Sequence, residues 1–108
     1  METKKYNAVK KLITYANDSI DDEYVEKIND KEVLKIKFQT GGTATTEKNG
    51  IFIEDLLIVA YAKLKEFNNQ IPCRENSIAL TKIEESILWL AKRKIERESR
   101  GVYGTENK

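Results

Sequence analysis

The sequence predicts an α+β protein in which an N-terminal antiparallel β-sheet precedes a C-terminal hairpin of two helices. Two patterns carry this prediction. Apolar residues and lysines alternate over residues 34–38, and after residue 53 apolar residues recur every three or four positions. A chain of 108 residues makes one compact domain. We therefore expect a single domain, residues 1–108, with a β-rich part over 1–50 and the helical hairpin over 51–105.

The β-rich part is predicted from short runs of β-favouring residues that end at turn signals. Leu12–Tyr15 is one such run, and Asn17-Asp18 stops it. In Val33–Phe38, every second residue is apolar, which is typical of a strand with one solvated face. The acidic segment 21–26 stays unassigned. Turn or loop signals stand at Asn29–Lys31, Gly41-Gly42, Thr43–Thr46 (a loop or an edge strand) and Asn49-Gly50.

The helical hairpin is predicted from two apolar stripes that a proline separates. Pro72 ends the first helix, and the second is expected from about Cys73 to Arg97, with Gly101 as its stop. Trp89 lies nearly half a turn from the second stripe. We expect it to pack in the core; the alternatives are the sheet or a second subunit. The stripes consist of Leu56, Leu57, Ala60, Tyr61, Leu64 and Phe67, and of Leu80, Ile83, Ile87 and Leu90.

The composition favours a cytoplasmic protein. Its formal net charge of +1 is close to balance, whereas proteins dedicated to DNA or membrane surfaces usually carry a basic excess. A single cysteine, Cys73, excludes an intrachain disulfide. No stretch approaches roughly 18 apolar residues, and the N-terminal residues MetGluThrLysLysTyr lack the apolar core of a signal peptide.

Catalytic chemistry is not indicated. The chain has no histidine, the commonest general base, and no recognisable nucleophile elbow or phosphate loop. A zinc site here would consist mostly of carboxylates, and the spacing of the acidic residues at 21–26 matches no calcium loop. We therefore expect no catalytic residue, no metal and no cofactor.

The end of the second helix is the segment that most indicates a ligand. Residues 92–100 contain five cations and two carboxylates. When the spacing of the apolar stripe is continued past Leu90, it falls on Lys94 and Arg97. Arg93 lies one turn before Arg97, so the two guanidinium groups can converge on one anion. Two interpretations follow: a phosphate-binding clamp, or cations that favour the helix C-terminus and pair with the local glutamates.

Phe67 is the second candidate, because it stands at the last turn of the first helix beside the polar run 68–70. One interpretation is that it closes the core of the hairpin. The other is that its ring, near amides such as Asn76, provides a platform for a purine.

Two segments resemble a phage protein family. Residues 73–90, CRENSIALTKIEESILWL, with Arg97 and the segment RGVYGT at 100–105, are similar to the Thoeris anti-defence family. That family shares its helical-hairpin domain with anti-CBASS sponge proteins. The hairpin resemblance covers about residues 50–105, and the N-terminal half resembles the Thoeris branch, which has a sheet before the hairpin. Tyr103 departs from the pattern, where an acidic residue is expected.

The resemblance implies a protein that sequesters cyclic ADP-ribose isomers (gcADPR-type) from bacterial TIR-domain enzymes without cleaving them, and so blocks Thoeris immunity in the host cytoplasm. It implies a homo-oligomer, a dimer or a hexamer, and in some members a second site for cyclic di- or trinucleotides. Neither a membrane nor a nucleic-acid polymer is an expected partner. Carried onto this chain, it assigns Phe67 to stacking, Asn76 to hydrogen bonding, and Arg93 to the phosphates or a cation–π contact. The secondary ligand-binding candidates are Arg97, Arg100 and Thr105.

Geometry adds a constraint on these candidates. Asn76 and Arg93 are 17 residues apart on one predicted helix, hence about 26 Å apart at 1.5 Å per residue. One small ligand cannot touch both on a straight helix. If both bind it, they come from different protomers whose hairpins pack antiparallel.

Other classes of function stay open. The main alternative is an oligomeric hairpin module that binds nucleic acid through its basic helix end, or a partner protein through its apolar seam and Trp89. An enzyme that degrades the same cyclic signal is a further alternative.

Overall fold

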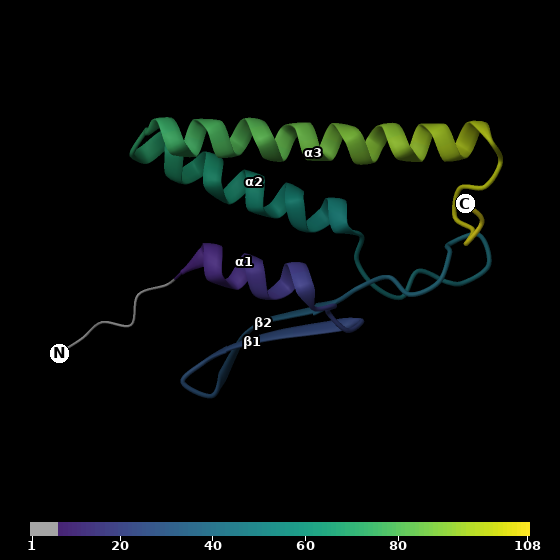
Figure 1. The fold of residues 1–108 in the computed structure, drawn as a ribbon, viewed down its shortest axis with the longest axis horizontal. Coiled ribbons are helices and arrows are strands. Elements are labelled where there is room, and N and C mark those ends of the chain that lie inside the picture. The colour runs from purple at the N-terminus through teal and green to yellow at the C-terminus, as the bar shows by residue number, and fades with distance from the viewer. Residues whose placement is uncertain (1–6) are drawn as a thin grey trace. The chain divides into compact units, whose positions relative to one another are not determined.

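The computed structural model describes residues 7–108, which form three helices and a two-stranded sheet (Figure 1). The chain divides into two compact units, one that ends at Ile36 and one that spans Lys37–Lys108. The α+β class, with an antiparallel sheet before two C-terminal helices, is confirmed. One domain over 1–108 stays a prediction. The elements are α1 (Ala8–Asn17), β1 (Glu23–Ile28), β2 (Lys31–Lys37), α2 (Ile53–Gln70) and α3 (Arg74–Ser99). The N-terminal residues 1–6, expected to lack a signal-peptide core, lie outside the described residues.

The first element is a helix where the sequence was expected to form a strand. α1 contains the run Leu12–Tyr15, so the assignment of that run to the β-rich part is wrong. The side chain of Asn7 caps the helix by accepting a hydrogen bond from the backbone N–H of Lys10 at 3.0 Å. Apolar residues at positions 9, 12 and 13 also recur at helical spacing, which the short run alone did not reveal.

β1 and β2 form a hairpin that closes at the predicted turn. Asn29 and Asp30 have φ values of 50° and 65°, the left-handed backbone that a two-residue hairpin turn requires and that Asn and Asp tolerate. The unassigned acidic segment 21–26 contributes the start of β1. The strand predicted over Val33–Phe38 is β2, while Phe38 forms an isolated parallel bridge with Ile51.

Side-chain contacts fasten α1 to β1 within the first unit. Lys11 Nζ donates to Glu26 Oε1 at 2.5 Å, and the rings of Tyr15 and Tyr24 meet edge to face with centroids 6.2 Å apart. The hydrogen bond from Lys11 holds the pKa of the Glu26 carboxyl below its usual value, and the carboxylate raises the pKa of Lys11. Each charge therefore stabilises the other.

α2 and α3 pack side by side as the predicted hairpin (Figure 1). The backbone N–H of Phe52, just before α2, donates to the Asp55 carboxylate at 3.0 Å, which caps the helix start. Pro72 follows the end of α2, and Cys73 is the N-cap of α3. Gly101, at φ 71°, supplies the predicted stop after α3.

The seam between α2 and α3 is only partly buried. The predicted seam residues Leu80, Ile83, Ile87 and Leu90 are intermediate in exposure, as are Leu56, Leu57, Tyr61 and Leu64 of α2. The Tyr61 hydroxyl donates to Glu84 Oε1 at 2.5 Å across the two helices, and the negative carboxylate raises the pKa of Tyr61. Over residues 7–108 the buried apolar side chain is that of Ile36, so the hairpin encloses no apolar side chain completely.

Trp89 lies on the outer face of α3, so the expectation that it packs in the core is wrong. Its side chain is 66% exposed, and Leu88 and Ile95 beside it are equally open. Lys92 Nζ lies 4.8 Å from the centre of the Trp89 ring, a surface cation–π contact. A group of large exposed apolar side chains on one helix is typical of a surface that another molecule covers.

The ion pair between Lys11 and Glu26 makes the attachment of α1 dependent on pH. Because the pKa of Glu26 is lowered in the folded state, its contribution is present above its ordinary value of 4.5 and is lost as the pH falls through the lowered value. We expect the Tyr15–Tyr24 contact to weaken on acidification, as measured by NMR cross-peaks between the two rings. Lys11→Met is the control, and should remove this pH dependence. Cross-peaks that persist unchanged in the wild type well below the pKa of a free carboxyl would contradict the prediction.

Candidate functional site

A pocket of about 470 Å³ lies at the open end of the α2–α3 hairpin, away from the turn at Pro72. Its walls come from the loop before α2, the last turns of α3 and the tail that follows α3. All three belong to the second compact unit. The charged lining residues are Glu54, Arg93, Lys94 and Arg97, and the aromatic ones are Phe52 and Tyr103.

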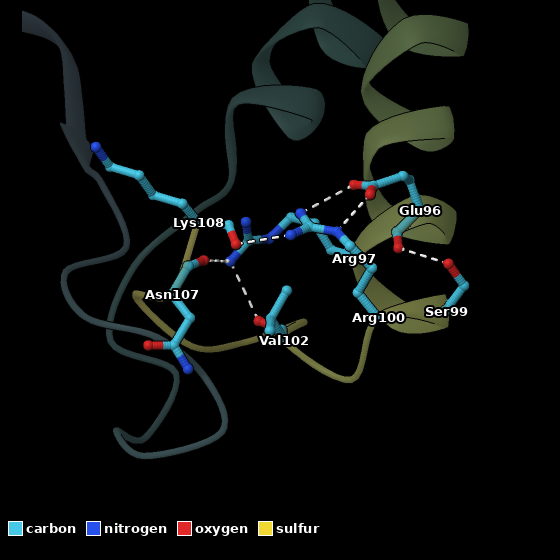
Figure 2. Close-up of polar contacts among 7 residues, drawn as sticks. All are labelled: Glu96, Arg97, Ser99, Arg100, Val102, Asn107 and Lys108. Carbon is cyan, nitrogen blue, oxygen red and sulfur yellow. Dashed lines mark hydrogen bonds and ion pairs between the residues drawn. The ribbon is translucent and has the colours of Figure 1, made fainter.

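Arg97 holds the tail in place through its guanidinium group (Figure 2). The Nη2 atom donates to the backbone carbonyls of Val102 and Thr105, each at 3.1 Å, and of Asn107 at 2.6 Å. The residue is only 8% exposed. A buried cation needs such partners, and the carbonyl oxygens of the tail supply them. Arg97 therefore positions one wall of the pocket.

The tail meets the loop before α2 through a close backbone approach. The backbone N–H of Ala44 donates to the carbonyl of Gly104 at 2.8 Å. A Cβ on Gly42 would lie 2.1 Å from that same carbonyl oxygen, so only glycine fits there. Gly104 itself has a φ of 76°. Gly42, part of the double glycine that the sequence showed only as a break, is thus what lets the tail dock against the loop.

The pocket combines positive charge with aromatic rings. Three cations and one carboxylate line it. Each aromatic ring also has a lysine over it: Lys48 Nζ lies 5.1 Å from the centre of the Phe52 ring, and Lys94 Nζ lies 5.2 Å from that of Tyr103. Cations of this kind bind phosphate oxygens, and exposed rings stack on planar bases.

The structure brings three of the six candidate ligand residues together. Arg93, Arg97 and Thr105 all line the pocket. The Nη2 atom of Arg97 already donates to the tail carbonyls. Its guanidinium group is therefore not free to turn toward an anion beside Arg93. Arg100 lies outside the lining, where its guanidinium pairs with Glu96 and donates to the carbonyl of Lys108 at 2.7 Å (Figure 2).

Phe67 and Asn76 lie at the closed end of the hairpin. Phe67 is 51% exposed, with Lys63 Nζ 5.2 Å from its ring centre, so its ring is available at the surface. Asn76 stands in the first turn of α3, where its backbone N–H donates to Cys73 Sγ at 3.4 Å. Seventeen residues of continuous helix, about 26 Å, separate Asn76 from Arg93. On one protomer these two candidates do not share a site.

Sequence reasoning missed several walls of the pocket. Phe52 and Tyr103 were not proposed as ligand residues, and Gly41 to Thr43 were treated as a break and a loop. The nearest signals were the double glycine and the departure at Tyr103. Neither indicates proximity, because the loop and the tail lie about 60 residues apart in the chain and meet only in the folded unit.

Two further features concern the described part of the chain. In residues 7–108, no helix is long and apolar enough to cross a membrane. Within the same range, His, Cys, Asp and Glu form no group of three or more that could hold a metal ion.

The fold and pocket define a class of protein: a helical hairpin with a cationic, aromatic-lined pocket at its open end. Residues 30–94 match the model of the Acb2/Tad1 hairpin domain. Over 78 residues the chain is 45% identical to "Thoeris anti-defense 1" of Bacillus phage SBSphiJ7, an alignment that covers 71% of this chain and 55% of that protein. The chain belongs to the Acb2/Tad1 hairpin-domain family, which confirms the resemblance to the Thoeris anti-defence proteins. It spans about half the length of the relative that it matches.

The role of Arg97 in holding the tail predicts a sharp difference between two conservative substitutions. Arg97→Lys keeps the charge but lacks the planar fork, and we expect it to lower the free energy of unfolding by about 2 kcal/mol. Hydrogen exchange should accelerate first in residues 102–107. Arg100→Lys is the matched control, because its contacts lie at the exposed surface and should cost at most about 0.5 kcal/mol. Equal effects of the two substitutions would contradict the assignment.

Proposed function

We propose that the protein binds a cyclic ADP-ribose isomer and sequesters it without cleavage, and thereby blocks Thoeris immunity in the cytoplasm of the infected bacterium. The observation that carries the proposal is the pocket at the open end of the hairpin, which Arg93 and Lys94 line together with the rings of Phe52 and Tyr103. Family membership and the phage relative named for Thoeris anti-defence support it.

The pocket matches the chemistry of this ligand. A cyclic ADP-ribose carries a pyrophosphate, ribose hydroxyls and a purine. Arginine and lysine bind phosphate oxygens through charge-assisted hydrogen bonds. The Thr105 hydroxyl donates to the carbonyl of Val102 and accepts from the backbone N–H of Asn107, which leaves one lone pair to accept from a ligand hydroxyl. Cations stabilise bound phosphates, and the chain contains no histidine to act as the usual general base. Binding without cleavage is the simpler chemistry for such a site.

A second copy of the chain completes the proposed site. Antiparallel packing of two α3 helices, crossing at Leu88 and Trp89, sets Glu85 of one copy opposite Lys92 of the other, so that opposite charges meet. The same register sets Asn76 of the second copy level with Gly101 along the helix axis, at the end of the hairpin where the pocket lies. Phe67, at the closed end of the second hairpin, comes with it. The exposed outer face of α3 supports this arrangement, because the assembly would cover it.

The proposal includes two further features that the family resemblance implies. The assembly is a dimer or a hexamer built from such dimers, and a second site takes cyclic di- or trinucleotides. The alternative is an oligomeric hairpin module that binds nucleic acid or a partner protein. The segment 92–100, with five cations and two carboxylates, favours contact with phosphates, either those of a small nucleotide or those of a nucleic-acid polymer. Binding to a nucleic-acid polymer would be steeply salt-dependent, and a partner-binding module would show no response to small nucleotides.

Ligand binding is tested by thermal unfolding with a panel of cyclic ADP-ribose isomers and cyclic di- and trinucleotides. At a ligand concentration of about 100 times Kd, we expect stabilisation by about 2.7 kcal/mol. Denaturation of the complex should release the cyclic ADP-ribose intact. Phe67→Ala and Arg93→Ala should abolish the shift, whereas Lys31→Ala, a cation in the other compact unit, should leave it unchanged. No shift with any cyclic ADP-ribose isomer would refute the proposed ligand, and release of a linear product would refute sequestration.

Assembly through α3 is tested by a charge on its outer face. Trp89→Glu should yield a smaller species in analytical ultracentrifugation and should weaken ligand binding at least tenfold, because the site loses the second copy. Val59→Glu on α2 is the control: Val59 is 67% exposed, close to the 66% of Trp89, and this variant should retain the α3 dimer. A Trp89→Glu variant that stays assembled, or a wild-type monomer that binds tightly, would rule out the shared site.

A further inference from the structure

Tyr103 is an aromatic wall of the pocket that stands on the tail. Its side chain is 39% exposed, and Lys94 Nζ lies 5.2 Å from the ring centre. The other charged contact of Lys94 is long, with 4.0 Å between its Nζ and Glu98 Oε1. In residues 7–108, no hydrogen bond engages the Tyr103 hydroxyl. The ring is therefore partly exposed, and the Lys94 ammonium lies over it.

The neighbouring residues of the tail keep Tyr103 at the pocket. Val102 and Thr105 are held by Arg97, and the carbonyl of Gly104 accepts from Ala44 at 2.8 Å. The backbone on both sides of Tyr103 is thus fixed while its ring stays exposed. Phe52, the other aromatic wall, differs in that it is partly buried and its backbone caps the start of α2.

We infer that Tyr103 and Lys94 act as an exchangeable pair that selects ligands carrying a heteroaromatic base. The base stacks on the Tyr103 ring in place of the Lys94 ammonium, and the released ammonium binds a phosphate oxygen of the same ligand. The inference rests on the proposed function and adds to it a residue that determines specificity. It predicts that base and phosphate are recognised together by neighbouring side chains.

Magnitudes favour the exchange. A cation–π contact at an exposed site contributes about two- to fivefold to an equilibrium constant, whereas stacking of a base on an aromatic side chain contributes about 5- to 150-fold. Lys94 also gains a phosphate partner in exchange for the ring. A phosphate that lacks a base gains the contact with the Lys94 ammonium but not the stacking on the Tyr103 ring. The affinity ratio between a nucleotide and a bare pyrophosphate therefore reports on Tyr103.

The test is isothermal titration of the full chain with three probes: cyclic ADP-ribose, ADP and inorganic pyrophosphate. Tyr103→Leu should lower the affinity for both nucleotides by about 5- to 150-fold and should not weaken the binding of pyrophosphate, which also shows that the pocket is intact. Tyr103→Phe keeps the ring and should behave as the wild type. Lys94→Gln should weaken all three probes. Lys35→Gln is the matched control, because Lys35 pairs with Glu23, neither residue lines the pocket, and the change should affect none of the three probes.

The outcomes separate this inference from the proposed function. If Tyr103→Leu binds cyclic ADP-ribose and ADP as tightly as the wild type does, the inference is wrong and the proposed function stands. If Tyr103→Leu weakens pyrophosphate as much as the nucleotides, the ring only supports the pocket and the inference is also wrong. If the wild type binds ADP in a Tyr103-dependent way but no cyclic ADP-ribose, the proposed function fails and the inference holds. A wild type that binds neither nucleotide overturns both.

Discussion

The buried guanidinium of Arg97 is the group on which the pocket depends. Its Nη2 reaches the carbonyls of three tail residues, and the tail in turn forms one wall of the pocket. Without these bonds, the open end of the hairpin would consist of a helix start, a helix end and a loop. The tail has little apolar surface to bury, so hydrogen bonds to a charged donor are what hold it against the loss of conformational entropy.

A shortage of buried apolar surface is the second constraint on this fold. A chain of 108 residues has a small core at best, and here the seam between α2 and α3 stays partly exposed while Leu88, Trp89 and Ile95 face outward. The proposed assembly would cover the outer face of α3, and it would bring Phe67 of the second copy to the pocket as a third aromatic ring beside Phe52 and Tyr103. Stability, assembly and ligand affinity would then be linked and would depend together on protein concentration.

The parts of the fold that could be predicted are those with local signals. The α2–α3 hairpin follows from two apolar stripes and Pro72, and the β-turn follows from Asn29-Asp30. α1 was missed because Leu12–Tyr15 is β-favouring by itself, whereas its cap at Asn7 lies outside that run. In the candidate site, the basic end of α3 was visible in the sequence. The walls at Phe52 and Tyr103 were not, because their approach depends on Arg97 and on the contact of Gly42 with Gly104.

The tail is anchored almost entirely by its main chain. Arg97 binds carbonyl oxygens, and Ala44 donates to the carbonyl of Gly104, groups that every amino acid carries. A side chain on this tail, such as that of Tyr103, can therefore change without releasing the wall on which it stands. Mutational drift at such a position alters what the pocket prefers while the scaffold persists. For a lineage that meets changing chemical signals, the separation of anchoring from recognition is a short evolutionary path to a new ligand.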